Sequence, residues 1–117
     1  MEPFQLHAVI QSTALILFLF GIYYAKKHNH RIHHLFVYSA VGLLTVGTAY
    51  MIYIVGGVPS AHGKFGLFVY IYVLFATASG RLFLGRKIKR NTHKLIASSA
   101  VLLLLFQILS ALYLYVL

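Results

Sequence analysis

Four histidines stand at the edges of apolar stretches, and their imidazoles are the groups in this sequence best suited to chemistry. They are His7, His33, His62 and His93. A neutral imidazole has one nitrogen lone pair that can bind a transition metal. A histidine near membrane depth is costly unless it has such a partner, so its presence there indicates a function.

Two of these histidines are the first residues of two similar sequence segments. The stretch His33–Leu44 reads HHLFVYSAVGLL, and the stretch His93–Leu104 reads HKLIASSAVLLL. Both share the leading histidine, a leucine at the third position, a Ser-Ala-Val core and a closing Leu-Leu. His7 and His62 open the other two apolar stretches. The sequence therefore predicts an internal repeat of two halves, each with two histidines.

Composition points to a membrane protein. Of the 117 residues 61% are hydrophobic, and Glu2 is the single acidic residue. A helix needs about 20 apolar residues to cross a bilayer, and backbone groups in lipid must bond within the helix. We predict an all-α fold, an integral membrane up-down-up-down four-helix bundle that forms one transmembrane domain over residues 1–117. Its expected spans are Gln5–Ala25, His34–Val55, Phe65–Leu84 and Leu95–Leu117.

The basic residues predict the orientation. Lys64 alone lies between the second and third spans, and the other nine lysines and arginines flank the remaining two loops. The positive-inside rule then places these two loops in the cytoplasm and both termini outside, most simply in the plasma membrane. Charge arranged in this way contacts the lipid bilayer and does not predict nucleic-acid binding. The oligomeric state stays open between a monomer and a homodimer.

The depths of the histidines predict a cofactor. His7 and His62 lie at the outer ends of their spans, and His33 and His93 at the inner ends. Helices one and three, and helices two and four, are diagonal neighbours in an up-down bundle. Because cysteine is absent and methionine is scarce, histidine pairs are the expected axial ligands of a haem. We predict two haem b groups per chain, held by His7 with His62 and by His33 with His93.

The inner ligand on the second span has an alternative. The repeat aligns His33 with His93, whereas the pattern of a basic residue three positions earlier, Arg31 or Arg90, aligns His34 with His93. Only one of two adjacent residues can face the core, because a helix turns by about 100° per residue. The longer identity downstream favours His33. A surface zinc or copper site on the neighbouring loop histidines is not favoured, since their spacing fits no standard site.

These motifs resemble the core of the cytochrome b561 family of transmembrane di-haem electron carriers. His62-Gly-Lys-Phe-Gly-Leu is similar to that family's His-x-x-x-Gly-Leu motif, and His7-Ala-Val is similar to its first core helix. Ala97 stands where the family often has glycine after the fourth ligand. The resemblance covers nearly the whole chain. It implies the same two histidine pairs and transmembrane electron transfer.

Other polar residues are candidates for contact with the haem propionates. Cations at the inner level are Arg31, Arg90 and Lys94, and Lys64 is the cation at the outer level. Gln11 lies four residues after His7 on the same helix face, and Gln107 returns to the outer level. Both glutamines need a partner at membrane depth, and a hydrogen bond between helices is the simplest one.

We therefore expect electron transfer from a donor to an acceptor on the other side of the membrane. The donor could be ascorbate, which the family suggests, or a quinol. Donor and acceptor could each be a small molecule or a protein. Whether the chain acts as an oxidoreductase in its own right stays open. It could instead be a haem-bearing anchor subunit of a larger oxidoreductase, or one half of a haem-modifying architecture. A four-helix small-molecule transporter is disfavoured, because proton-coupled export of cations generally needs an intramembrane carboxylate.

Overall fold

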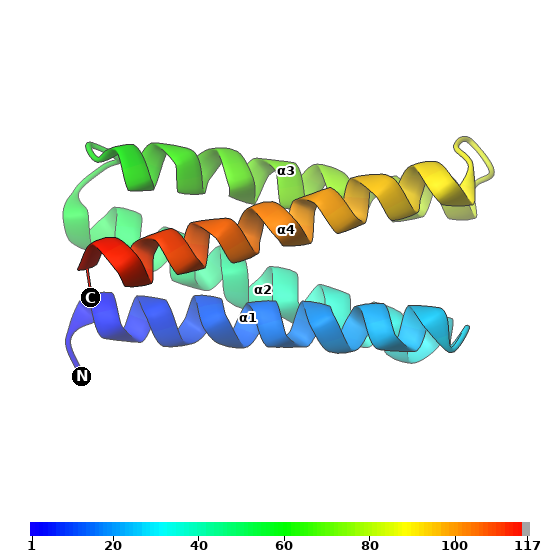
Figure 1. The fold of residues 1–117 in the computed structure, drawn as a ribbon, viewed down its shortest axis with the longest axis horizontal. Coiled ribbons are helices and arrows are strands. Elements are labelled where there is room, and N and C mark those ends of the chain that lie inside the picture. The colour runs from blue at the N-terminus through cyan, green and yellow to red at the C-terminus, as the bar shows by residue number, and fades with distance from the viewer. Residues whose placement is uncertain (116–117) are drawn as a thin grey trace. The chain divides into compact units, whose positions relative to one another are not determined.

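The computed structural model describes residues 1–115 and consists of helices joined by short loops (Figure 1). The helices are α1 (Pro3–Lys26), α2 (His30–Val55), α3 (Ala61–Leu84) and α4 (Arg90–Tyr115). Each is long and apolar enough to cross a membrane. The predicted all-helical class is confirmed. The predicted spans lie within these helices, except that residues 116 and 117 of the fourth fall outside the described residues.

Polar capping residues make two of the helices longer than their apolar stretches. The Asn29 side chain accepts a hydrogen bond of 3.2 Å from the Ile32 N–H at the start of α2. The Ser60 hydroxyl accepts one of 2.9 Å from the Gly63 N–H at the start of α3. A cap satisfies an N–H that has no partner within the helix, so α2 and α3 begin four residues before their predicted spans. His33 and His62 consequently lie inside helices.

The chain divides into two compact units, Met1–Pro59 and Ser60–Leu117. We refer to the first, with α1 and α2, as hairpin one, and to the second, with α3 and α4, as hairpin two. Contacts between early residues of one helix and late residues of the other show that both hairpins are antiparallel. In hairpin two, for example, Gln107 late in α4 bonds to His62 at the start of α3, and Ser79 late in α3 contacts His93 at the start of α4.

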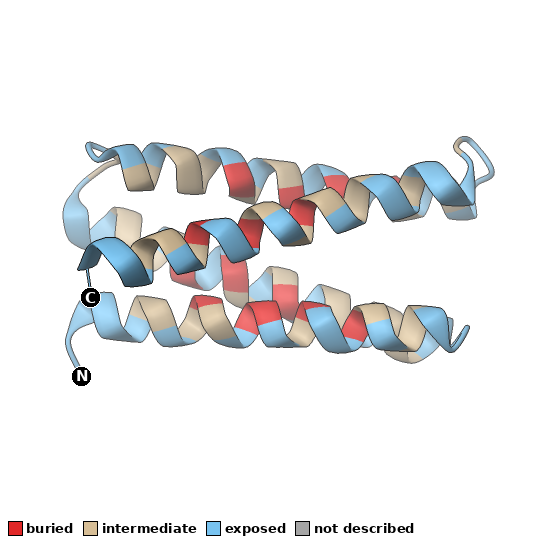
Figure 2. Ribbon diagram, in the orientation of Figure 1, coloured by how far each residue is buried: buried red, intermediate tan, exposed pale blue. Residues whose placement is uncertain are grey.

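The sequence repeat is also a repeat of packing. Ala40 and Leu44 of α2 are buried, and so are their counterparts Ala100 and Leu104 of α4 (Figure 2). The next buried position on each helix is Gly47 in α2 and Gln107 in α4. The helices α2 and α4 therefore bury the same face, and their buried residues differ in type at one equivalent position, Gly47 and Gln107.

Much of the apolar surface of both hairpins is exposed. Among the exposed side chains are Ile71, Leu102 and Phe106, each more than half accessible. An apolar surface of this extent is unfavourable in water. Together with the length of the four helices, it is compatible with an integral membrane protein.

Candidate functional site

His7 is held by the backbone of the neighbouring helix. Its Nδ1 lies 2.9 Å from the Gly47 carbonyl oxygen of α2. A carbonyl can only accept, so Nδ1 carries the proton and the lone pair of the neutral ring lies on Nε2. Histidines that bind metals commonly donate their second ring N–H in this way, which fixes both tautomer and orientation. His7 thus has the geometry of a metal ligand in its own hairpin.

His33 repeats this arrangement at the other end of hairpin one. Its Nδ1 lies 2.7 Å from the Gly21 carbonyl oxygen of α1, so it too has its lone pair on Nε2. The adjacent His34 packs its ring 5.9 Å from the ring of Tyr38, which belongs to the same helix. The His33 imidazole is thus fixed by a hydrogen bond to a backbone carbonyl of α1.

His93 rests against three residues of α3. Its Nδ1 lies 2.7 Å from the Ser79 hydroxyl. Its ring stacks on Phe83 with 6.0 Å between centroids and 4° between planes. Gly80 leaves room for it, since a Cβ there would come within 3.2 Å of His93 Cε1. We call Ser79, Gly80 and Phe83 the His93 cradle.

His62 is contacted by Gln107 of α4. The Gln107 amide donates a hydrogen bond of 2.8 Å to the His62 carbonyl oxygen, and the same nitrogen lies 3.4 Å from His62 Nε2. The His62 ring also meets Tyr115 edge to face at 5.7 Å. Gln107 therefore returns to the level of His62, as its position in the sequence predicts.

Two glutamine–glycine pairs lie next to His7 and His62. The glutamine is on the first helix of hairpin one and on the second helix of hairpin two. In hairpin one Gln11 of α1 packs on Gly47 of α2, and in hairpin two Gln107 of α4 packs on Gly66 of α3. Both glutamines are buried. The Gln11 amide donates a hydrogen bond of 3.0 Å to the Thr48 hydroxyl. Gln11, predicted to contact a cofactor, is thus used for contact between helices in this structure.

Each hairpin presents its two histidines far apart. His7 is level with Gly47, whereas His33 is level with Gly21, fourteen residues after His7 on α1. At about 1.5 Å per residue the two imidazoles of hairpin one are separated by about 21 Å along the helix. In hairpin two the corresponding positions on α3 are His62 and Ser79, which gives about 25 Å. One iron cannot bind both histidines of one hairpin.

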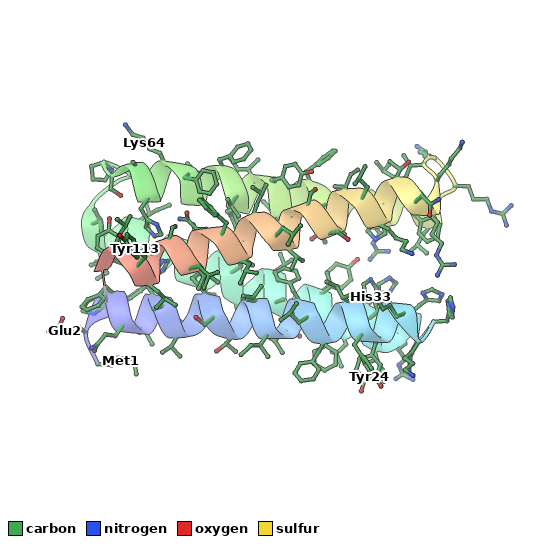
Figure 3. All side chains as sticks on the ribbon, in the orientation of Figure 1. Met1, Glu2, Tyr24, His33, Lys64 and Tyr113 are labelled. Carbon is green, nitrogen blue, oxygen red and sulfur yellow. The ribbon has the colours of Figure 1, made fainter. Side chains whose placement is uncertain are left out.

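The four predicted propionate contacts are exposed cations near the histidines in sequence. They are Arg31 of α2, Lys64 of α3, and Arg90 and Lys94 of α4. Figure 3 shows Lys64 projecting outward near the start of α3. The sequence of hairpin two contains no aspartate or glutamate. Such cations are suited to anionic groups brought by a ligand.

Comparison with family models, with curated proteins and with solved structures found no match. The resemblance to the cytochrome b561 family therefore stays a prediction from sequence motifs.

Several residues of the site were not predicted as its members. The Gly21 and Gly47 carbonyls leave no side-chain signal in the sequence, because any residue has a carbonyl. From the sequence, Ser79 and Gly80 are small residues, which indicate only that helices can pack closely there. A hydroxyl on the third helix at the level of His93 is the signal that could have identified Ser79.

Proposed function

We propose that this protein carries electrons across a membrane through two b haems. His7 and His62 bind the outer haem, and His33 and His93 bind the inner one. The observation that carries the proposal is the fixed tautomer of His7 and His33, which donate their Nδ1–H groups to carbonyls of the neighbouring helix. That contact prepares Nε2 for a metal, and it is typical of histidines that bind one.

The separation of the histidines supports two haems instead of one. With about 21–25 Å between the imidazoles of a hairpin, each iron takes one imidazole from each hairpin. The family resemblance implies the same pairing. The donor set also suits haem, since a low-spin b haem needs two neutral imidazoles and nothing else from the protein.

When bound, each haem supplies a one-electron iron couple, and the chain supplies the conditions for it. The imidazoles bind and orient the ring, and the apolar helix faces keep water away from it. Arg31, Arg90 and Lys94 attract the propionates of the inner haem, and Lys64 is available to those of the outer one. The surplus of cations at the inner level also favours an anionic donor there.

The direct test is a reduced-minus-oxidised spectrum of the purified full chain, with the haem content measured per chain. We expect two low-spin b haems. His28→Ala, in the exposed loop between α1 and α2, is the matched control and should keep both. A colourless preparation with intact helical content, from cells that have ample haem, would overturn the proposal.

The choice between adjacent histidines has its own test. We expect His33→Ala to remove the inner haem, because this change deletes the imidazole whose Nδ1 is held by Gly21. His34→Ala should keep both haems. The opposite pattern in the haem content would assign the inner ligand to His34.

A further inference from the structure

We infer that Ser79 is a positioning residue for His93, and that it fixes both the tautomer of the imidazole and its strength as an iron ligand. The part of the inference that concerns iron rests on the proposed function. The part that concerns the tautomer does not, because it follows from the hydrogen bonds of α3 and α4 alone.

The direction of the hydrogen bond follows from counting protons. The Ser79 hydroxyl has a single proton, which it donates to the Ala76 carbonyl oxygen one turn earlier. Its lone pairs are left to face His93 Nδ1 at 2.7 Å. His93 must therefore be the donor, with its proton on Nδ1 and its lone pair on Nε2. Ser79 is only 1% exposed, so water cannot easily replace the serine as acceptor.

The other two members of the cradle limit rotation of the ring. Phe83 stacks parallel to the imidazole, and Gly80 admits its Cε1 edge where a larger residue would press against it. Together with the Ser79 bond, these contacts define the ring plane and the direction of Nε2. A ligand whose direction is fixed in advance loses less entropy when it binds iron.

The acceptor also sets how strongly His93 donates to a metal. A hydrogen bond from Nδ1–H moves electron density toward Nε2, which stabilises ferric over ferrous iron and so lowers the reduction potential. The bond from Ser79 to Ala76 polarises the hydroxyl and makes the chain of two hydrogen bonds mutually supportive. Removing the hydroxyl should thus raise the potential of the inner haem and weaken its binding by about 10- to 100-fold.

The test is Ser79→Ala, read in two ways. In the full chain prepared without haem, ¹⁵N NMR of His93 should show the Nδ1–H tautomer for the natural chain and a mixture of tautomers for the variant. In the haem-loaded chain, a redox titration should show a raised inner potential and an unchanged outer one. Ser79→Thr retains a hydroxyl that can bond back along the helix, and should restore both readouts.

Ser110→Ala is the matched control. The Ser110 hydroxyl makes the same type of bond back along its helix, 2.9 Å to the Gln107 carbonyl, at the opposite end of α4 from His93. This variant should leave the His93 tautomer and the inner potential unchanged. Retention of the outer haem in Ser79→Ala shows that the variant is folded, and helical content serves the same purpose for the haem-free chain.

The outcomes separate this inference from the proposed function. An unchanged His93 tautomer in Ser79→Ala overturns the positioning role, whatever the haem content. A shifted tautomer in a chain that binds no haem supports the positioning role and contradicts the proposed function. A shifted tautomer with an unchanged inner potential would show that Ser79 orients His93 without tuning its iron.

Discussion

The two hairpins hold their histidines by different means. Hairpin one uses the backbone carbonyls of Gly47 and Gly21 to hold the rings of His7 and His33. In hairpin two the contacts come from side chains of the neighbouring helix: the Ser79 hydroxyl meets the His93 ring, and the Gln107 amide bonds to the His62 carbonyl and lies 3.4 Å from His62 Nε2. A carbonyl cannot be removed by substitution, but a hydroxyl or amide can. The contacts of the hairpin-one histidines are therefore fixed by the backbone, whereas those of the hairpin-two histidines can be changed by substitution.

Glycine explains why the backbone can serve in hairpin one. Gly21 and Gly47 are both buried between α1 and α2, and the absence of Cβ atoms allows the neighbouring helix to approach. Close approach of this kind is a general use of small residues between membrane helices. In hairpin two Gly66 and Gly80 also face the neighbouring helix, but the atoms nearest to them belong to the side chains of Gln107 and His93.

The largest expected effect is that of Gly47→Ala. A Cβ at this position would meet the end of the Gln11 side chain closer than 3.0 Å and Ile10 Cγ2 at 3.0 Å, so Gln11 must turn away and Ile10 must also shift. Overpacking costs about 1–3 kcal/mol, offset by up to about 1 kcal/mol of helix propensity. We expect a lower unfolding midpoint in detergent micelles and, under the proposed function, weaker binding of the haem assigned to His7 and His62.

Gly42→Ala is the matched control on the same helix, because nothing lies within 4 Å of a Cβ at that position. It should leave the unfolding midpoint unchanged or slightly raised. Equal losses of stability in Gly42→Ala and Gly47→Ala would contradict the idea that close packing at Gly47 holds hairpin one together.

A second effect in hairpin one is expected from Thr48→Val. This change removes the acceptor of the Gln11 amide at a buried position, and an unsatisfied buried amide costs about 1–3 kcal/mol. Urea unfolding of the micellar protein should show the loss. Gln11→Leu combined with Thr48→Val should recover part of it, since both polar partners are then gone. If the double variant recovers no stability, loss of the Gln11–Thr48 hydrogen bond is not the cause of the destabilisation in Thr48→Val.

Gly66→Ala should cost less than Gly47→Ala. A Cβ at Gly66 would meet the end of the Gln107 side chain at 2.7 Å, and a flexible side chain can turn away. The loss of stability is then that of one hydrogen bond, about 1 kcal/mol, and His62 loses its contact with the Gln107 amide. Comparison of the two unfolding midpoints is the measurement. A larger loss for Gly66→Ala would show that hairpin two is the rigid half.

The smallest effect is expected from Tyr72→Phe. Its hydroxyl bonds to Ser99, but Ser99 also bonds to the Ile96 carbonyl and so retains a partner. We expect a loss of about 0.5 kcal/mol in the same unfolding assay, near the lower end for one hydrogen bond. A loss as large as that of Thr48→Val would mean that this contact organises hairpin two.

The helices were predictable because about 20 apolar residues leave few alternatives, whereas their starts were not. The predicted spans begin where the apolar residues begin, but the caps Asn29 and Ser60 add a helical turn of polar residues before them. The match of His33 to His93 predicted equivalent positions, and both lie half-buried with Nδ1 directed at the neighbouring helix.

The partners of the histidines were beyond the sequence for a physical reason. Which carbonyl or hydroxyl faces Nδ1 depends on the rotation and register of two packed helices, and apolar periodicity specifies neither to within one residue. Gln107 was a partial exception, since a buried amide at a known depth needs a partner. Its depth places it at the level of His62, but the sequence leaves the partner open.

The measurement that tests the central claim most directly is the haem content of two double variants. If the histidines pair between hairpins at each level, His7→Ala with His62→Ala removes one site and leaves one haem per chain. His7→Ala with His93→Ala removes a ligand from each site and leaves none. Loss of both haems in the first double variant, or retention of a haem in the second, would contradict the pairing.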